Sequence, residues 1–123
     1  MSTRNATCAC GQLAVTCSQE PNLVALCHCL ACKKRTGSAY GIAAFFAKDA
    51  VAISGNSHQF VRQADSGFAV TFHFCPTCGS TVFWVAARRP DDIAVAAGAF
   101  ADPDFPAPAK EVYTDHRNVW LAP

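Results

Sequence analysis

The sequence predicts a mainly β fold, built from antiparallel strands with little helix. Most of its apolar segments are short and lie between turn residues. Residues 68–74 alternate between Phe or Val and smaller or polar residues, which is typical of a strand with one buried face. The 123 residues show no repeat and no linker-like stretch. We therefore expect a single domain over residues 1–123.

Eight segments have the length and composition of short strands: 13–17, 23–27, 40–47, 51–54, 58–62, 68–74, 81–85 and 93–97. A short helix is expected after Cys29, and Gly37 would end it. Residues 101–109 contain three prolines, so we expect an extended surface segment there, packed by Phe105.

The charge balance argues against a nucleic-acid partner and against a disordered chain. Ten basic and nine acidic residues give a net charge of +1, and charged residues make up 15% of the chain. A nucleic-acid-binding domain would carry a basic patch, so no nucleic-acid partner is expected. The chain is 51% hydrophobic with almost no net charge, which excludes disorder as a description of the whole chain.

No segment predicts export or membrane insertion. The first residues, MSTRNATCACG, lack the apolar region of a secretory signal. The uncharged run 66–87 contains Pro76, Gly79 and a Cys-x-x-Cys pair and alternates with period two, so a transmembrane helix is not expected. We expect a cytoplasmic protein. In a reducing compartment, eight cysteines point to metal binding or catalysis rather than disulfides.

Seven of the eight cysteines fall into three tight groups, and Cys17 stands alone. A short turn can direct two sulfurs at the same metal ion. A structural zinc takes four ligands, whereas a catalytic zinc keeps one position open. The groups therefore divide into a closed site and a three-thiolate site, with two zinc ions per chain. The closed site would hold Cys8, Cys10, Cys75 and Cys78, and the open site Cys27, Cys29 and Cys32.

Other interpretations of the cysteines remain open from spacing alone. A redox-active Cys-x-x-Cys pair needs a βαβ setting, but Cys78 leads into a strand. Iron–sulfur spacings do not match the triplet. The strongest alternative is a module with two closed structural sites, in which Cys17 or a histidine completes the second. The side chain of His28 would point away from those of Cys27 and Cys29 if that segment is extended.

The motifs around the cysteines resemble those of the glutathione-dependent formaldehyde-activating enzymes, whose zinc-binding domain is shared with centromere protein V. The resemblance rests on CACGQL, CHCLACKKRTGSAYG, FCPTCGSTVFW and AAGAFADP, with Arg117 and Trp120 closing the pattern. It covers nearly the whole chain and implies an Mss4-like antiparallel β fold. It also implies a structural zinc on the first cysteine set, a catalytic zinc on the second, and addition of glutathione to formaldehyde. Glu111 stands where some members carry a histidine.

The residues after the third ligand supply candidate substrate contacts. Three thiolates and a substrate thiolate on Zn²⁺ carry a net charge of −2, so such a zinc would hold a thiolate rather than act as a strong Lewis acid. Lys33, Lys34 and Arg35 could offset that charge and bind the carboxylates of a peptide-like thiol, and Ser38 could donate a hydrogen bond. The alternative for the basic run is a solvated turn.

Two functions follow from these observations. The first is a zinc-dependent, carbon–sulfur lyase-type enzyme that forms or cleaves adducts between a small thiol, such as glutathione, and a small aldehyde, such as formaldehyde. The second is a non-enzymatic protein-interaction module held together by two structural zinc ions.

Overall fold

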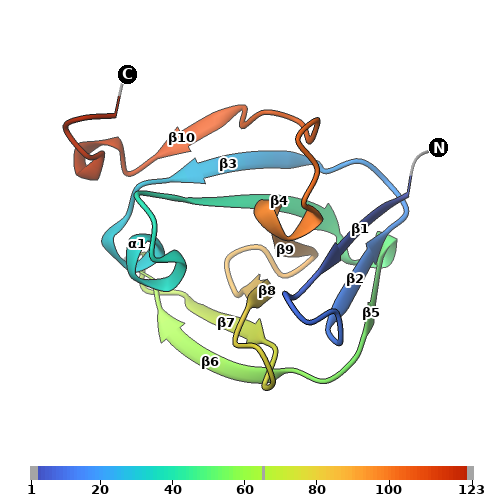
Figure 1. Cartoon of the computed structure of the whole chain (residues 1–123). Helices are drawn as coiled ribbons and strands as arrows, with labels where there is room; N and C mark the ends of the chain where they lie inside the picture. Colours follow the sequence, from blue (N-terminus) through green and yellow to red (C-terminus); the bar gives the residue numbers. More distant parts are fainter. Residues whose placement is uncertain (1–2, 65, 122–123) are drawn as a thin grey trace.

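The computed structural model describes residues 3–64 and 66–121, and in this part of the chain the strands form two sheets (Figure 1). The smaller sheet has the order β1 (Arg4–Thr7), β2 (Ala14–Cys17), β5 (Val51–Ser54). The larger sheet has the order β10 (Lys110–Val112), β3 (Leu23–Cys27), β4 (Gly41–Ala47), β9 (Asp92–Ala96), β8 (Thr81–Ala86), β7 (Ala69–Phe74), β6 (His58–Gln63). The prediction of a mainly β, antiparallel fold is confirmed.

The helical segments are short. The helix α1 (Leu30–Thr36) lies between β3 and β4, and three 3₁₀ turns cover Lys48–Ala50, Ala97–Phe100 and Thr114–His116. The expected helix after Cys29 is therefore present, and Gly37 ends it in the left-handed conformation, at φ 65°, with its N–H bonded to the carbonyl of Lys33 at 2.8 Å. None of the described helices is long and apolar enough to cross a membrane.

Two strands were not among the eight expected segments. The first, β1, is polar apart from Ala6, so it lacks a clear alternating pattern. The second, β10, has three residues and pairs in parallel with β3, whereas the other strand pairs are antiparallel. The eight expected strands occur with ends within one or two residues of the predicted ones.

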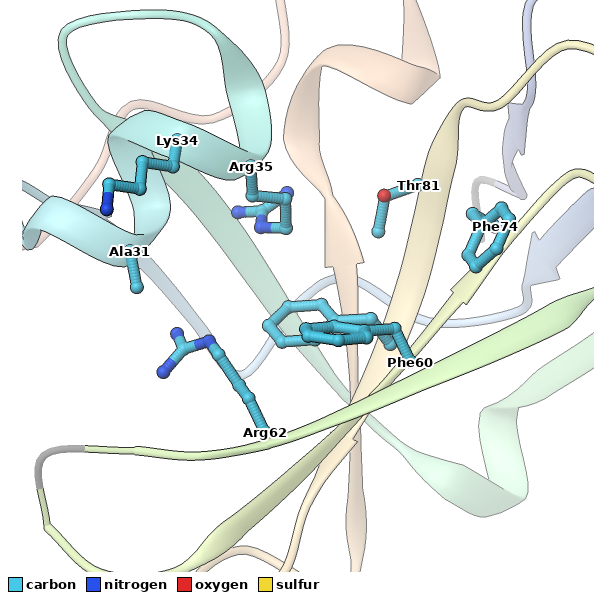
Figure 2. A pocket seen from close by; sticks show the side chains of 8 residues that line it. Ala31, Lys34, Arg35, Phe60, Arg62, Phe74 and Thr81 are labelled. Carbon is cyan, nitrogen blue, oxygen red and sulfur yellow. The ribbon is translucent and has the colours of Figure 1, made fainter.

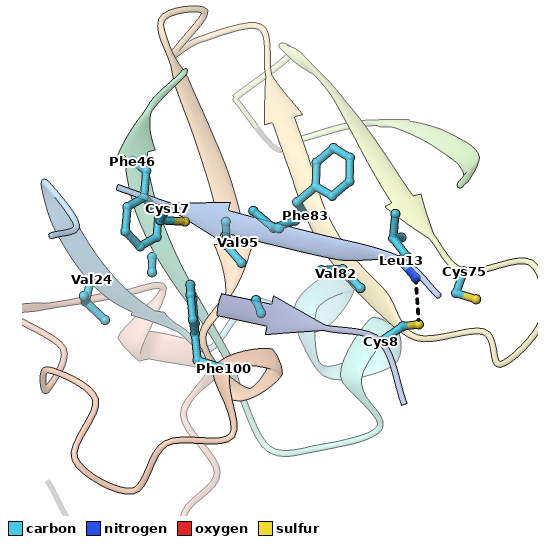
Figure 3. Packing of buried hydrophobic residues seen from close by; sticks show 13 residues of the cluster. Cys8, Leu13, Cys17, Val24, Phe46, Cys75, Val82, Phe83, Val95 and Phe100 are labelled. Carbon is cyan, nitrogen blue, oxygen red and sulfur yellow. Dashed lines mark hydrogen bonds between the residues drawn. The ribbon is translucent and has the colours of Figure 1, made fainter. Parts of the chain in front are cut away.

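The main core lies between the two sheets. The smaller sheet contributes Ala6, Val15 and Cys17, while Phe46 and Val95 belong to the larger one. Figure 3 shows that Cys8 and Cys75 lie at one end of this core. The core therefore extends to Cys8 and Cys75, two of the four cysteines of the predicted closed zinc site.

The opposite face of the larger sheet carries a second, smaller cluster of buried residues, formed by Val70, Phe72, Trp84 and Ala94. Neighbouring residues on one strand alternate between the two clusters, as Ala94 and Val95 do. The guanidinium of Arg35, from α1, lies over the ring of Trp84 at 4.4 Å from its centroid. This face is thus covered partly by cationic side chains and not by another sheet.

The segment 101–109 follows the core surface without regular secondary structure. The ring of Phe105 stacks on that of Phe100 with centroids 4.7 Å apart, and the N–H of Ala109 donates to the carbonyl of Val24 at 2.9 Å. These contacts attach the segment to the sheet just before β10 begins.

Candidate metal centres and the adjoining hollows

Four cysteines from two distant parts of the chain meet at one point. Their Sγ atoms all lie within 4.8 Å of one another. We call Cys8, Cys10, Cys75 and Cys78 the four-thiol cluster. The first pair lies in the loop between β1 and β2, and the second lies in the turn between β7 and β8. The cluster therefore connects the smaller sheet to the larger one.

Tight turns direct these sulfurs inward. Gly11 and Gly79 each follow a cysteine closely and have φ values of 86° and 80°, a region that favours glycine. The backbone N–H of Leu13 donates to Sγ of Cys8 at 3.3 Å (Figure 3), and the side-chain amide of Gln12 donates to Sγ of Cys75 at 3.2 Å. Such donors favour the thiolate form that a metal requires.

Cys78 also favours the thiolate form. Its Sγ lies 3.4 Å from the hydroxyl of Ser80, and this hydrogen bond is the main cause that lowers the pKa of Cys78 to about 5. Cys78 is exposed, while Cys8 and Cys75 are buried. An all-sulfur set of four that includes a ready thiolate suits a closed zinc site.

A second cluster lies where β3 leads into α1. Its members, Cys27, Cys29 and Cys32, have Sγ atoms within 4.8 Å of one another, and we call it the three-thiol cluster. Cys29 is the N-cap residue of α1, and its Sγ accepts the backbone N–H of Cys32 at 3.3 Å. The Cys-x-x-Cys spacing thus follows from the first turn of the helix.

Among the described residues, no fourth Cys, His, Asp or Glu side chain joins the three-thiol cluster. Cys17 is fully buried in the main core. His28 is also buried, but its Nε2 lies 2.8 Å from Oε1 of Glu111, in a hydrogen bond to that carboxylate. The residues that could have closed the second site are therefore engaged elsewhere.

Hydrogen bonding within the three-thiol cluster shifts the pKa values of its members in opposite directions. The thiol of Cys32 donates to Cys27, which holds the pKa of Cys27 below its ordinary value and raises that of Cys32. The guanidinium of Arg35 lies beside Cys32 and favours its thiolate. The hydrogen bond from Cys32 therefore favours the thiolate form of Cys27, the form in which a cysteine binds a metal.

Glu111, which stands where some family members carry a histidine, contacts the segment between Cys27 and Cys29. The parallel pairing of β10 with β3 aligns Val112 with Cys27, and the backbone N–H of His28 donates to the carbonyl of Val112 at 3.1 Å. Oε1 of Glu111 also accepts a hydrogen bond from Arg117 at 3.3 Å. The hydrogen bond with His28 is the largest cause that lowers the pKa of Glu111, and the bond from Arg117 is the second. This chain of contacts fixes the peptide between Cys27 and Cys29.

The four candidate substrate-binding residues lie in different surroundings. The ammonium of Lys33 donates to the carbonyl of His116 at 2.6 Å and to the side chain of Asn118, so it contacts the C-terminal segment. Lys34 and Arg35 line a hollow beside α1. Ser38 is exposed in the loop after the helix, where its N–H donates to Oγ1 of Thr36 at 3.2 Å.

The hollow between α1 and β6, β7 and β8 has a volume of about 330 Å³, and we call it the arginine hollow (Figure 2). Cationic and aromatic side chains dominate its lining, which consists of Ala31, Lys34, Arg35, Phe60, Arg62, Phe72, Phe74 and Thr81. A smaller hollow of about 170 Å³ shares Arg35, Arg62 and Phe72 with it and is also lined by Cys32. The arginine hollow thus adjoins the three-thiol cluster.

One family of proteins matches this chain along most of its length. The family model described as glutathione-dependent formaldehyde-activating enzyme covers residues 3–116. The chain belongs to this family. Among solved structures, a Rhodobacter sphaeroides protein is similar at 20% sequence identity and a TM-score of 0.60, over 87% of this chain and 98% of that chain, which shows a shared fold. No curated protein matches the chain.

Family membership agrees with the resemblance found in the cysteine motifs, but the motifs did not point to every residue near the site. Phe60 and Arg62 were expected only as part of a strand. Their spacing of two places both on one face of β6, opposite Phe72 and Val70 of β7. The spacing of Arg62 from Phe60 was the signal in the sequence that the two side chains share a face of the strand. That this face lies near α1 depends on the tertiary structure, which the sequence did not indicate.

Proposed function

We propose that this member of the family is a zinc-dependent, carbon–sulfur lyase-type enzyme that forms or cleaves adducts between a small thiol and an aldehyde. Glutathione or a similar thiol and formaldehyde are the substrates that the family description suggests. The observation that carries the proposal is the difference between the two clusters: one offers four sulfurs, and the other offers three beside a cationic hollow. A zinc site with three protein ligands is the pattern of a catalytic centre.

The residues present fit two zinc ions. The four-thiol cluster would hold a structural zinc, and the three-thiol cluster would hold a catalytic one. In the second site, zinc would supply a position where a substrate thiol stays deprotonated at neutral pH and remains nucleophilic. Arg35 and Lys34 would attract and orient the acidic end of the thiol. Lys33, which already contacts the C-terminal segment, would contribute positive charge, and Ser38 would lie at the outer edge of the site.

The reaction balances without an oxidant or a further reactant. A carbon–sulfur bond forms between the thiol sulfur and the aldehyde carbon, and the carbon–oxygen double bond becomes a single bond. The proton lost from the thiol is matched by one taken up at the aldehyde oxygen. Cleavage of the adduct reverses these changes. The role left to the protein is positioning and control of the thiol's charge.

The test is the rate at which glutathione and formaldehyde exchange with their adduct, measured by NMR exchange spectroscopy with the zinc-loaded protein. We expect the parent chain to accelerate the exchange over buffer, Cys29→Ser to abolish that acceleration, and Cys17→Ala to preserve it as a matched cysteine control. If the parent holds two zinc ions and does not accelerate the exchange, the assignment of glutathione and formaldehyde as the substrate pair is wrong, and the interaction module described above is favoured.

A further inference from the structure

We propose that the arginine hollow recognises the non-reacting end of the substrate, and that this end is both acidic and apolar. The ligand class is a thiol carboxylate that carries an aromatic or bulky aliphatic group, or the aldehyde adduct of such a thiol. This inference rests on the proposed function, because it assigns the thiol of the same molecule to the three-thiol cluster.

Among the described residues, the two arginines of the hollow have no carboxylate partner. Arg4, Arg89 and Arg117 each form an ion pair with a carboxylate, but within the described residues neither Arg35 nor Arg62 does. Both line the hollow. Their guanidinium carbons lie 5.4 and 5.3 Å from the centroid of the Phe72 ring, so two positive charges lie beside the same ring and repel each other. A bound anion would relieve this repulsion, and arginine is well suited to hold a carboxylate through two hydrogen bonds.

Arg35 is held in place with hydrogen-bond capacity to spare. Its guanidinium lies over the ring of Trp84, and its buried Nε has no hydrogen-bond partner among the described residues. Gly41 makes room for it, because a Cβ on Gly41 would lie 2.9 Å from Nη2 of Arg35. A cation held in place by stacking, with one donor unused, loses little entropy when it binds an anion.

The rest of the hollow is aromatic. Phe60 is 59% exposed, and Figure 2 shows its ring in the hollow, between Arg62 and Phe74. The volume of about 330 Å³ is at the lower end of the range for small-molecule sites. A ligand with an apolar group would cover exposed ring surface, which a purely hydrophilic thiol would leave in water.

The position of Cys32 links the hollow to the chemistry. Its side chain lines the smaller hollow, which shares Arg35, Arg62 and Phe72 with the larger one. A molecule that begins at the three-thiol cluster therefore passes Arg35 before it reaches Phe60. This order predicts a thiol at one end of the ligand, a carboxylate near its middle and an apolar group beyond it.

The experiment measures the binding of four probes to the zinc-loaded chain by isothermal titration calorimetry. The probes are α-benzyl-β-mercaptopropionate, its uncharged amide, β-mercaptopropionate without the ring, and α-benzylpropionate without the thiol. We expect the first to bind about tenfold or more tightly than the amide, from a charge-assisted contact, and about tenfold more tightly than the ringless acid, from ring burial.

Three variants locate the effect. Arg62→Met, at a half-exposed position, should weaken the benzyl acid about tenfold and leave the amide nearly unchanged. Gly41→Ala should weaken the acid in the same way, because it displaces the Arg35 guanidinium without removing its charge. Lys48→Met removes one exposed cation that does not line the hollow, so it should bind all probes as the parent does.

The outcomes separate this inference from the proposed function. If the acid and the amide bind equally and Arg62→Met changes neither, the arginines only cap the sheet and the inference is wrong, even where thiol–aldehyde exchange is catalysed. If α-benzylpropionate binds in an Arg62-dependent way but Cys29→Ser weakens no thiol probe, the hollow recognises an apolar acid and the assignment of the thiol to the cluster fails.

Discussion

Cys17 shows that burial, rather than residue type, decides what a cysteine does in this protein. It is the last residue of β2, it is fully buried in the main core, and burial raises its pKa to about 11. At neutral pH its thiol is therefore protonated and behaves as a small apolar side chain. The seven other cysteines lie in the two clusters, with backbone or side-chain donors near several of their sulfurs.

Replacing Cys17 with serine tests this role. We expect the free energy of unfolding to fall by about 1–3 kcal/mol, because the serine hydroxyl would be buried in an apolar core without a hydrogen-bond partner. The zinc content should stay unchanged. Urea denaturation and metal analysis of the purified variant measure the two quantities. Loss of one zinc ion per chain would show that Cys17 is a ligand.

At the scale of single elements, α1 supplies Cys32 and the Cys29 cap to the three-thiol cluster but contributes little to the core. The helix has seven residues, and none of them is buried. Its first turn is fixed by the Cys29 cap, and its last turn ends at Gly37. An element of this kind can lose its metal without removing core contacts.

We expect Cys29→Ser to fold, to hold about one zinc ion fewer per chain and to bind no small thiol at the cluster. Serine is itself a favourable N-cap residue, so the start of α1 is preserved while a soft thiolate ligand is lost. Circular dichroism and metal analysis check these outcomes. If the variant unfolds globally, the three-thiol cluster is structural.

The turn between β7 and β8 has the opposite character, because it supplies half of the four-thiol cluster that joins the two sheets. Removing Cys78 should therefore cost a large part of the free energy of folding, since a structural zinc contributes about 10 kcal/mol or more. We expect Cys78→Ser to be insoluble or rapidly cleaved by protease. The four-thiol assignment is wrong if that variant keeps its thermal stability and full zinc content.

For the molecule as a whole, the sequence predicted what local geometry determines. Cysteine spacing reflects turns and a helix cap, so the three cysteine groups could be found without the fold. The meeting of the first and third groups was predicted from the number of ligands that a closed zinc site takes. The contacts of Glu111 with His28, and of Arg62 with the surroundings of Arg35, could not be predicted. They depend on the parallel pairing of β10 with β3 and on the placement of β6 near α1, which join residues far apart in the chain.

The central claim is that one metal centre is closed and the other accepts a thiol. X-ray absorption spectroscopy at the zinc edge tests it most directly, because it counts sulfur neighbours per metal ion. With two zinc ions bound, we expect an average of about 3.5 sulfur atoms per zinc, rising to about 4 when a small thiol is added. An average of about 4 before addition, unchanged by the thiol, would contradict the account.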